Sequence, residues 1–322
     1  MPGEAGTSSV ANPFYMRDVL KVSDFTAEDV RALLEEARWM KSLRRKGYLH
    51  SYLQGRTLAL IFEKPSTRTR VSFEVAMLEL GGHPLVLRSD ELQLGRGETV
   101  EDTARVLSRY VDGILLRTHA HETLERLAAA ADVPVINGLS DLHHPTQVFA
   151  DLLTLVEHFG PLGELKIAYV GDARNNVTHS WIEAAALLGL TLVVASPEEY
   201  RPDPEIWSWA EARAQESGAD LRWTSDPREA VADADVVITD TWVSMGTEAE
   251  REARLSRLRP YQVNEGLFAL ARKEAVFLHC LPAHRGEEVT EAVIDGPRSL
   301  VWDEAENRLH VHKALLRLVL AP

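Results

Sequence analysis

Short continuous runs of apolar residues, each followed by a segment with helical spacing, recur along most of the 322-residue chain. Such runs are typical of strands that are buried on both faces of a sheet. They occupy residues 58–62, 85–87, 114–116, 133–136, 166–170, 192–195, 236–239, 276–278 and 300–302. Since neighbouring parallel strands need a crossover, usually a helix, the alternation predicts an α/β fold whose parallel sheets are covered by helices.

A stretch rich in Gly and Pro at residues 159–163 divides this alternation into two halves. It follows a helix that we expect to begin near Thr146, and Gly with Pro commonly marks the end of a helix and a connection. The chain is also long enough for two ordinary domains. We therefore predict one domain over residues 1–160, a second over 161–303, and a last helix over 304–322 that packs back on the first domain.

The sequence Ser-Thr-Arg-Thr-Arg at residues 66–70 follows the first apolar run and opens a helix. Arginine side chains match phosphate oxygens, and the free N–H groups of a helix N-terminus favour an anion. The motif therefore predicts a phosphate site to which Arg68 and Arg70 both contribute. The alternative is that both arginines are solvated and Ser66 is an ordinary helix cap. The helix is expected to bury an apolar face formed by Val71, Val75 and Leu78.

Charge and cysteine content exclude several classes of protein. The formal net charge of −14 argues against a general nucleic-acid binder or a protein of anionic membrane surfaces. The only cysteine, Cys280, leaves no internal disulfide and fits a reducing compartment. Residues 1–18 do not resemble a secretory signal, and no window is apolar enough to span a membrane. These features predict a cytoplasmic protein without nucleic-acid or membrane partners.

Polar side chains gather directly after the predicted strands, where open parallel sheets place their ligands. Besides residues 66–70 they are Arg117, His144, Gln147, Asn175, Asn176, Asp240, His279 and Cys280. This pattern predicts an active site in a cleft between the two domains. Each residue also has an ordinary explanation: His144 as a structural histidine, Asp240 as a turn cap and Cys280 as a small core residue. Arg117 could be a charge at the rim, although an arginine that directly ends an apolar run is better placed to meet an anion.

Several motifs together resemble those of the carbamoyltransferases: residues 66–70, His-Pro-Thr-Gln at 144–147 and His-Cys-Leu-Pro at 279–282. Within that family, Asp-Thr-Trp-Val-Ser-Met-Gly at 240–246 is similar to the members that use ornithine. The resemblance covers nearly the whole chain. It implies transfer of the carbamoyl group of carbamoyl phosphate to the δ-amine of L-ornithine, giving L-citrulline and phosphate in arginine metabolism. It implies no metal and no organic cofactor.

The resemblance also implies roles for individual residues. The first domain would bind carbamoyl phosphate, with contacts from Ser66, Thr67, Arg68, Thr69, Gln93, Arg117, His144, Pro145, Thr146, Gln147, Cys280, Leu281 and Arg308. Ornithine would be held by Asn176, Asp240, Ser244 and Met245. Arg117, His144 and Cys280 would act in catalysis. Gln93 would reach the site of a neighbouring subunit, which implies a homotrimer or a multiple of trimers.

Two details of the acceptor side stay open at this level. Residues 171–176 contain one residue more than family members that read Gly-Asp-Gly-Asn-Asn, so either Asn175 or Asn176 could contact ornithine, with Asn176 favoured. The ornithine amine must lose a proton before it attacks, and Asp240 and Cys280 would orient it. The group that accepts this proton is not indicated by any motif.

The closest alternative function is a carbamoyltransferase with another amine acceptor, such as putrescine. Aspartate is disfavoured because the carboxylate of Asp240 would repel its second carboxylate. A nucleotide-dependent oxidoreductase is a more distant alternative, but Gly-Asp-Ala at residues 171–173 lacks the spaced glycines of a dinucleotide site. A binding protein without activity would not need His144 and Cys280 beside an arginine cluster.

Overall fold

The computed structural model describes residues 12–48, 50–88, 97–243 and 248–322. The strands within these ranges are β1 (Thr57–Phe62), β2 (His83–Arg88), β3 (Gly113–Arg117), β4 (Val135–Leu139), β5 (Lys166–Val170), β6 (Thr191–Ala195), β7 (Asp220–Thr224), β8 (Val236–Ile238) and β9 (Val276–Leu278). They form a four-stranded sheet in the order β2-β1-β3-β4 and a five-stranded sheet in the order β7-β6-β5-β8-β9. All strand pairs in both sheets are parallel, which confirms the predicted fold class.

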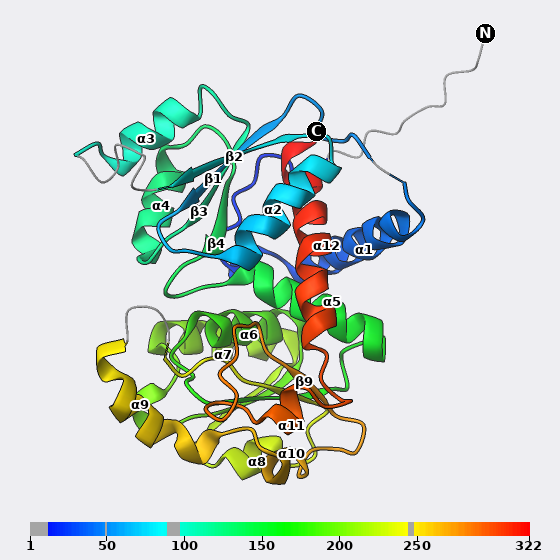
Figure 1. Cartoon of the computed structure of the whole chain (residues 1–322), viewed down its shortest axis with the longest axis vertical. Helices are drawn as coiled ribbons and strands as arrows, with labels where there is room; N and C mark the ends of the chain where they lie inside the picture. The colour runs from blue at the N-terminus through cyan, green and yellow to red at the C-terminus, as the bar shows by residue number, and fades with distance from the viewer. Residues whose placement is uncertain (1–11, 49, 89–96, 244–247) are drawn as a thin grey trace.

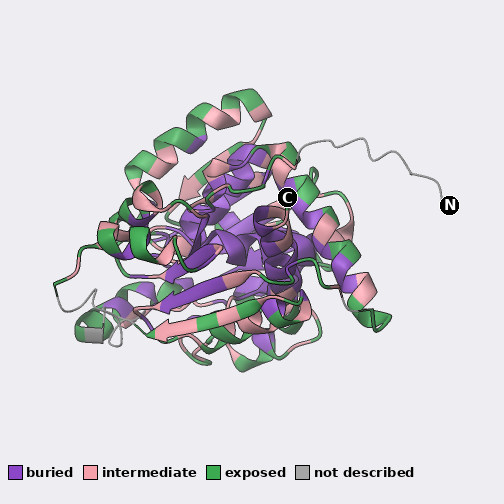
Figure 2. Cartoon of the chain, turned by 90° about the horizontal axis from the view of Figure 1, so that it is seen from above, coloured by how far each residue is buried: buried purple, intermediate pink, exposed green. Residues whose placement is uncertain are grey.

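Helices cover both sheets and form two lobes (Figure 1). They are α1 (Ala27–Arg45), α2 (Thr67–Glu79), α3 (Val100–Leu107), α4 (His121–Ala130), α5 (Pro145–Phe159), α6 (Asn176–Leu188), α7 (Pro204–Ser217), α8 (Pro227–Val231), α9 (Arg251–Leu258), α10 (Glu265–Phe268), α11 (Glu291–Ile294) and α12 (Val301–Leu320). Central strands are buried, whereas the edge strands β2 and β7 alternate between exposed and half-buried residues (Figure 2). Among the described residues, no helix is both long and apolar enough to cross a membrane.

One predicted strand is absent, and one observed strand was not predicted. The apolar run at residues 300–302 is not a strand, because Leu300 precedes α12 and the helix begins at Val301. Asp303 and Glu304 lie in its first turn, where acidic side chains favour a helix N-terminus. Strand β7 was not predicted, since its sequence Asp-Leu-Arg-Trp-Thr alternates polar and apolar residues as expected at a sheet edge, not in a continuous apolar run.

Helix α12 connects the two lobes of the molecule. It starts beside β9 of the second sheet and then packs against α1, α2 and α5 around the first sheet (Figure 1). Lys313 donates to Glu79 of α2 at 2.7 Å, and Asn307 donates to Thr154 of α5 at 2.9 Å. The helix thus closes the core beside the first sheet. The domain limits at residues 160 and 303 remain predictions.

Helix α2 buries a different face from the predicted one. Val71 and Leu78 are 51% and 61% exposed, whereas the buried apolar side chains are Phe73, Ala76 and Met77. Phe73 stacks on His312 of α12, with ring centroids 3.8 Å apart. Because both faces of α2 carry apolar residues, the position of α12 decides which face is buried, and a local pattern does not contain that information.

Candidate active site

The N-terminus of α2 brings together side chains from three elements. Ser66 precedes the helix, and its Oγ accepts a hydrogen bond from the backbone N–H of Thr69 at 3.2 Å. The Thr69 side chain is fully buried. Its Oγ1 accepts from Arg117 Nη1 at 3.2 Å and from Arg308 Nη2 at 3.0 Å. The end of β3 and the middle of α12 therefore meet at the start of α2.

Only one of the two motif arginines contributes to this cluster. Arg68 is half-buried and lies close enough to Arg117 and Arg308 to disfavour their protonated forms. Arg70 is exposed and pairs with Glu74 at 3.1 Å, one turn further along the helix. Residues two positions apart on a helix point to different sides, so the two guanidiniums cannot converge. The prediction that Arg70 contributes to the phosphate site was wrong.

The cluster is strongly cationic and has hydrogen-bond donors to spare. Burial, together with nearby Arg308 and Arg68, lowers the pKa of Arg117 to about 10. Burial likewise lowers the pKa of Arg308 to about 10. The buried Nε atoms of both residues find no partner among the residues that the structure describes. Buried, mutually repelling cations with free donors are suited to a doubly charged anion.

Lys64 adds a fourth cation that the motifs did not reveal. Its side chain lies in the loop between β1 and α2 and is 8% exposed. Burial lowers the pKa of the Lys64 ammonium group, and Arg117 lowers it further. A lysine before a proline in a loop resembles an ordinary surface residue in sequence, so only its burial identifies it as a candidate.

His144 and Gln147 lie at the start of α5, beside the arginines. The imidazole of His144 is buried, and its backbone N–H donates to Ser180 Oγ at 2.8 Å. Burial, together with Arg308 and Arg117, holds the pKa of His144 well below its ordinary value, so the ring is neutral. Gln147 Oε1 accepts from Arg308 Nη1 at 2.9 Å. Pro145 occupies the first position of α5, where its missing N–H costs nothing.

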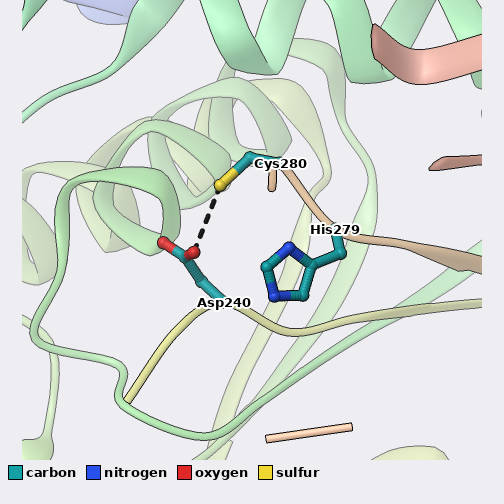
Figure 3. A group of neighbouring side chains, drawn as sticks. All are labelled: Asp240, His279 and Cys280. Atoms are coloured by element: carbon teal, nitrogen blue, oxygen red, sulfur yellow. Dashed lines mark hydrogen bonds between the residues drawn. The ribbon is translucent and has the colours of Figure 1, made fainter. Parts of the chain in front are cut away.

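The residues after β8 and β9 form a second group, drawn in Figure 3. The thiol of Cys280 donates to Asp240 Oδ1 at 3.1 Å. Burial and the neighbouring Asp240 raise the pKa of Cys280 well above its ordinary value, so the thiol keeps its proton. Cys280 is therefore a hydrogen-bond donor here and not a thiolate nucleophile.

His279 is held by hydrogen bonds on both ring nitrogens. Nδ1 accepts from the backbone N–H of Leu281 at 2.8 Å, so Nε2 carries the proton and donates to Glu288 at 2.9 Å. Atoms of Asp240, His279 and Cys280 lie within 4.8 Å of one another, a spacing that also suits a metal ion. Because both ring nitrogens and the thiol are already engaged, hydrogen bonding explains this arrangement better than metal ligation.

The two asparagines before α6 have different roles. Asn175 caps the helix: its Oδ1 accepts from Thr178 N at 2.8 Å, and its Nδ2 donates to Tyr169 Oη at 2.7 Å. Asn176 donates from Nδ2 to the backbone oxygen of Ser140 at 2.8 Å, and no described residue donates to its Oδ1. Only Asn176 keeps a polar atom for a ligand, which favours it over Asn175.

Thr146 lies buried in the first turn of α5, after Pro145. Apart from these two residues, Asn176 and Asp240, the predicted site residues fall into three sets. The structure brings together Ser66, Arg68, Thr69, Arg117, His144, Gln147, Arg308 and Cys280, since Arg117 and Arg308 both lie within electrostatic reach of the Cys280 sulfur. Thr67 is exposed, and Leu281 has an uncommon positive φ of 60° after the cluster. Gln93, Ser244 and Met245 lie outside the described residues. The functional roles of all of them remain predictions.

The burial of His179 leads us to expect that the free energy of unfolding depends on pH. Its Nδ1 donates to Leu142 O and its Nε2 accepts from Asp203 N, both at 3.0 Å, and burial lowers its pKa to about 4. A depressed pKa of a base contributes stability that is lost as pH falls from 6.5 to about 4, a loss of about 3 kcal/mol.

We expect His179→Asn, which keeps a donor and an acceptor, to flatten the fall in unfolding free energy over this pH range. Denaturant unfolding at several pH values measures it. The exposed His158 supplies the control variant His158→Asn, which should keep the wild-type pH dependence. An equally steep fall in His179→Asn would assign the acid instability to other groups.

Two family models match most of the chain. The model described as "Aspartate/ornithine carbamoyltransferase, carbamoyl-P binding domain" matches residues 17–157. The model described as "Aspartate/ornithine carbamoyltransferase, Asp/Orn binding domain" matches residues 163–319. The two matched ranges contain the first and the second sheet, respectively.

Curated relatives and solved structures agree with these matches. The ornithine carbamoyltransferase of Pyrococcus horikoshii is 56% identical, over 94% of this chain and 96% of the relative. The protein of Pyrococcus furiosus named "Ornithine carbamoyltransferase, anabolic" is 55% identical over the same shares. The structure of the Pyrococcus furiosus enzyme has a TM-score of 0.93 at 55% identity, covering 95% of this chain and 98% of that one. The Thermus thermophilus enzyme has a TM-score of 0.84 at 46% identity, covering 94% and 98%.

Proposed function

This chain belongs to the aspartate/ornithine carbamoyltransferase family, and from that membership we infer that it transfers the carbamoyl group of carbamoyl phosphate to the δ-amine of L-ornithine. It is an ornithine carbamoyltransferase, and its products are L-citrulline and phosphate. The observation that carries this conclusion is the cluster of Arg68, Arg117 and Arg308 at the N-terminus of α2, within a chain 55% to 56% identical to relatives named for ornithine.

The arginine cluster supports a mechanism for activating carbamoyl phosphate. Arg68 and the helix N-terminus would hold the phosphate, which gains charge as it leaves. Thr69 Oγ1 accepts from two guanidiniums, so its own hydroxyl hydrogen is free to donate to the substrate. Together with Arg117 and the neutral ring of His144, that hydroxyl would stabilise the carbonyl oxygen as the amine attacks. Such donors are already in place before the reaction and need no reorganisation.

The acceptor side supports binding of an amino acid that carries two amines. Asp240 Oδ1 accepts from the Cys280 thiol at 3.1 Å and from Thr241 N at 2.7 Å, while no described residue donates to Oδ2. That oxygen would bind the α-ammonium group of ornithine, and Asn176 would bind the α-carboxylate. Burial raises the pKa of Asp240. As the pH falls, Asp240 should therefore gain a proton, and ornithine binding should weaken, at a higher pH than for an ordinary aspartate.

Product formation from carbamoyl phosphate with four acceptors in parallel tests this function. The acceptors are ornithine, putrescine, aspartate and N-acetylornithine. Strong preference for ornithine is expected, because relatives at this identity are named for ornithine and Asp240 disfavours a second carboxylate on the acceptor. Preference for putrescine would keep the carbamoyl-phosphate half of the mechanism and overturn the roles of Asp240 and Asn176. No turnover from folded protein would overturn the function itself.

We further propose that the enzyme is a homotrimer or a multiple of trimers. Exposed apolar residues support this proposal: Val71 and Leu78 on α2 and Leu85 on the edge strand β2 are 51%, 61% and 39% exposed. Apolar side chains grouped on one pair of elements commonly mark a subunit contact. The role of Gln93 at such a contact lies outside the described residues, and a cytoplasmic location likewise stays a prediction.

Leu78→Glu is expected to reduce the mass of the assembly, because it places a charge on the proposed contact. Light scattering coupled to size-exclusion chromatography measures that mass. The control is Trp209→Glu on α7, an exposed apolar residue in the other lobe, which should keep the wild-type mass. An unchanged trimer in Leu78→Glu would place the subunit contact elsewhere.

A further inference from the structure

Two carboxyl groups lie together in the interior directly behind Gln147. Asp151 on α5 and Glu304 on α12 are each 1% exposed, and their carboxyl groups lie close enough for a hydrogen bond between them if one is protonated. Gln147 Nε2 donates to both, at 2.8 Å to Asp151 Oδ1 and at 3.1 Å to Glu304 Oε1. Two ionised carboxylates cannot form a hydrogen bond, and their repulsion in the interior is large, so one of them carries a proton.

The surrounding donors indicate which group is ionised. Asp151 Oδ2 accepts from Trp181 Nε1 on α6 at 2.9 Å, whereas Glu304 Oε2 accepts from the backbone N–H of His279 at 2.9 Å. With Gln147 at 2.8 Å, Asp151 has the closer pair of donors, which favours its charged form. The pKa of Glu304 is raised well above its ordinary value by burial and then by Asp151, which agrees with a protonated Glu304.

We propose that Asp151 and Glu304 share one proton, carried by Glu304, and that this pair positions Gln147 and Arg308 for carbamoyl phosphate. Gln147 Nε2 is held by both carboxyl groups, which turns its Oε1 toward Arg308 Nη1 at 2.9 Å. Arg308 in turn donates to Thr69. The role in binding rests on the proposed function, but the shared proton does not.

Charge balance around the pair gives the reason for a single proton. The charged or titratable groups that face it are Arg308 on α12 and Cys280 after β9, while α5 and α6 contribute the neutral Gln147 and Trp181. One negative charge offsets the buried guanidinium of Arg308 before the substrate binds. Two negative charges on the pair would compete with the substrate phosphate for Arg308. A pair without any negative charge would leave the three neighbouring arginines without a buried counter-charge.

The pair also joins the two sides of the site. Asp151 bonds to α6 through Trp181, and Glu304 bonds to the backbone of His279, the residue before Cys280. The chain segment that carries the Cys280 thiol is therefore fixed to the same pair that orients Gln147. A change in protonation would reach the carbamoyl-phosphate side and the acceptor side together.

Infrared difference spectroscopy tests the shared proton without any measurement of activity. Wild type and Glu304→Gln are compared at pH 8, where Glu183, whose pKa burial raises to about 7, is mostly ionised. The band of a protonated carboxyl group is expected in wild type and absent in Glu304→Gln. The control is Glu306→Gln, two positions along the same helix at a half-exposed carboxyl group bonded to His310, and it should keep the band. A band that survives in Glu304→Gln overturns the proposal.

Kinetics test the positioning role. Asp151→Asn is expected to lower kcat/KM for carbamoyl phosphate about tenfold more than Glu304→Gln, because an amide cannot offset Arg308. Wild type should also lose kcat/KM at alkaline pH through ionisation of Glu304, a loss that Glu304→Gln should lack. Equal effects of the two variants, or the same alkaline loss in Glu304→Gln, overturn the assignment. If Asp151→Asn does not fold, the infrared and pH comparisons of Glu304→Gln still decide.

Failure of the proposed function is a separate outcome. It would appear as folded wild-type protein that turns over none of the four acceptors. The infrared band would then still report whether the pair holds a proton. The two proposals can therefore fail independently.

Discussion

Replacing Arg68 with alanine should raise KM for carbamoyl phosphate about 10- to 100-fold, the value of one or two hydrogen bonds to a charged group. Arg68 is half-buried beside Arg117 and Arg308, and no described residue accepts a hydrogen bond from its guanidinium. Its removal therefore takes away a phosphate contact without breaking a contact within the protein. Steady-state kinetics give the change in KM, and thermal unfolding should show a melting temperature close to wild type.

Arg70→Ala is the matched control for this variant. Arg70 belongs to the same motif, but it is exposed and its ion pair with Glu74 is of the kind that contributes little to stability. Its KM for carbamoyl phosphate should stay near wild type. Equal losses in the two variants would mean that general positive charge, and not the position of Arg68, attracts the substrate. Near-normal kinetics in Arg68→Ala would overturn the phosphate site.

Replacing Asp240 with asparagine should raise KM for ornithine about 100-fold or more, the loss expected when one partner of a buried charge pair is removed. The variant keeps an oxygen for the Cys280 thiol and for Thr241 N, but it removes the charge that Oδ2 offers to an ammonium group. Affinity for carbamoyl phosphate alone, measured by calorimetry, should change little because the arginine cluster is intact.

The matched control is Asp295→Asn, an exposed aspartate of the same lobe that pairs with Arg285 at 2.7 Å. It should leave both substrates unaffected. A larger change in carbamoyl-phosphate affinity than in ornithine KM for Asp240→Asn would assign Asp240 to the other substrate. In that case the acceptor would be recognised by the segment at residues 244–247 and by Asn176.

The strand pattern was sufficient to predict the fold class, because buried parallel strands can be recognised in a sequence as continuous apolar runs. Features that depend on contacts between distant segments were not predictable in this way. Which face of α2 is buried depends on the contact between Phe73 and His312. Residues 300–302 stand at the start of α12 and do not form a strand, because the acidic residues that follow them favour a helix N-terminus. Strand β7 was missed because an edge strand alternates in polarity.

The candidate site shows the same division between local and distant information. Residues at strand ends were placed near one another by the geometry of parallel sheets, as with Arg117 and His144. Three features could be recognised only in the three-dimensional structure. They are the ion pair between Arg70 and Glu74, the burial of Lys64 and the pairing of Asp151 with Glu304. Charge pairs and burial are properties of the folded chain. A sequence motif therefore identifies candidate site residues but does not show which of them lie in the site.

The position of Arg308 in the chain bears on how the enzyme is made. Helix α12 is synthesised after both sheets, yet it supplies Arg308 to the start of α2 and packs against α1, α2 and α5. A nascent chain that contains every strand but not α12 still lacks Arg308 of the arginine cluster and the helix that closes the core beside the first sheet. If Arg308 binds carbamoyl phosphate as proposed, we expect binding to begin only after α12 has been synthesised and has packed against α2, and we expect a chain that ends before α12 not to bind this substrate.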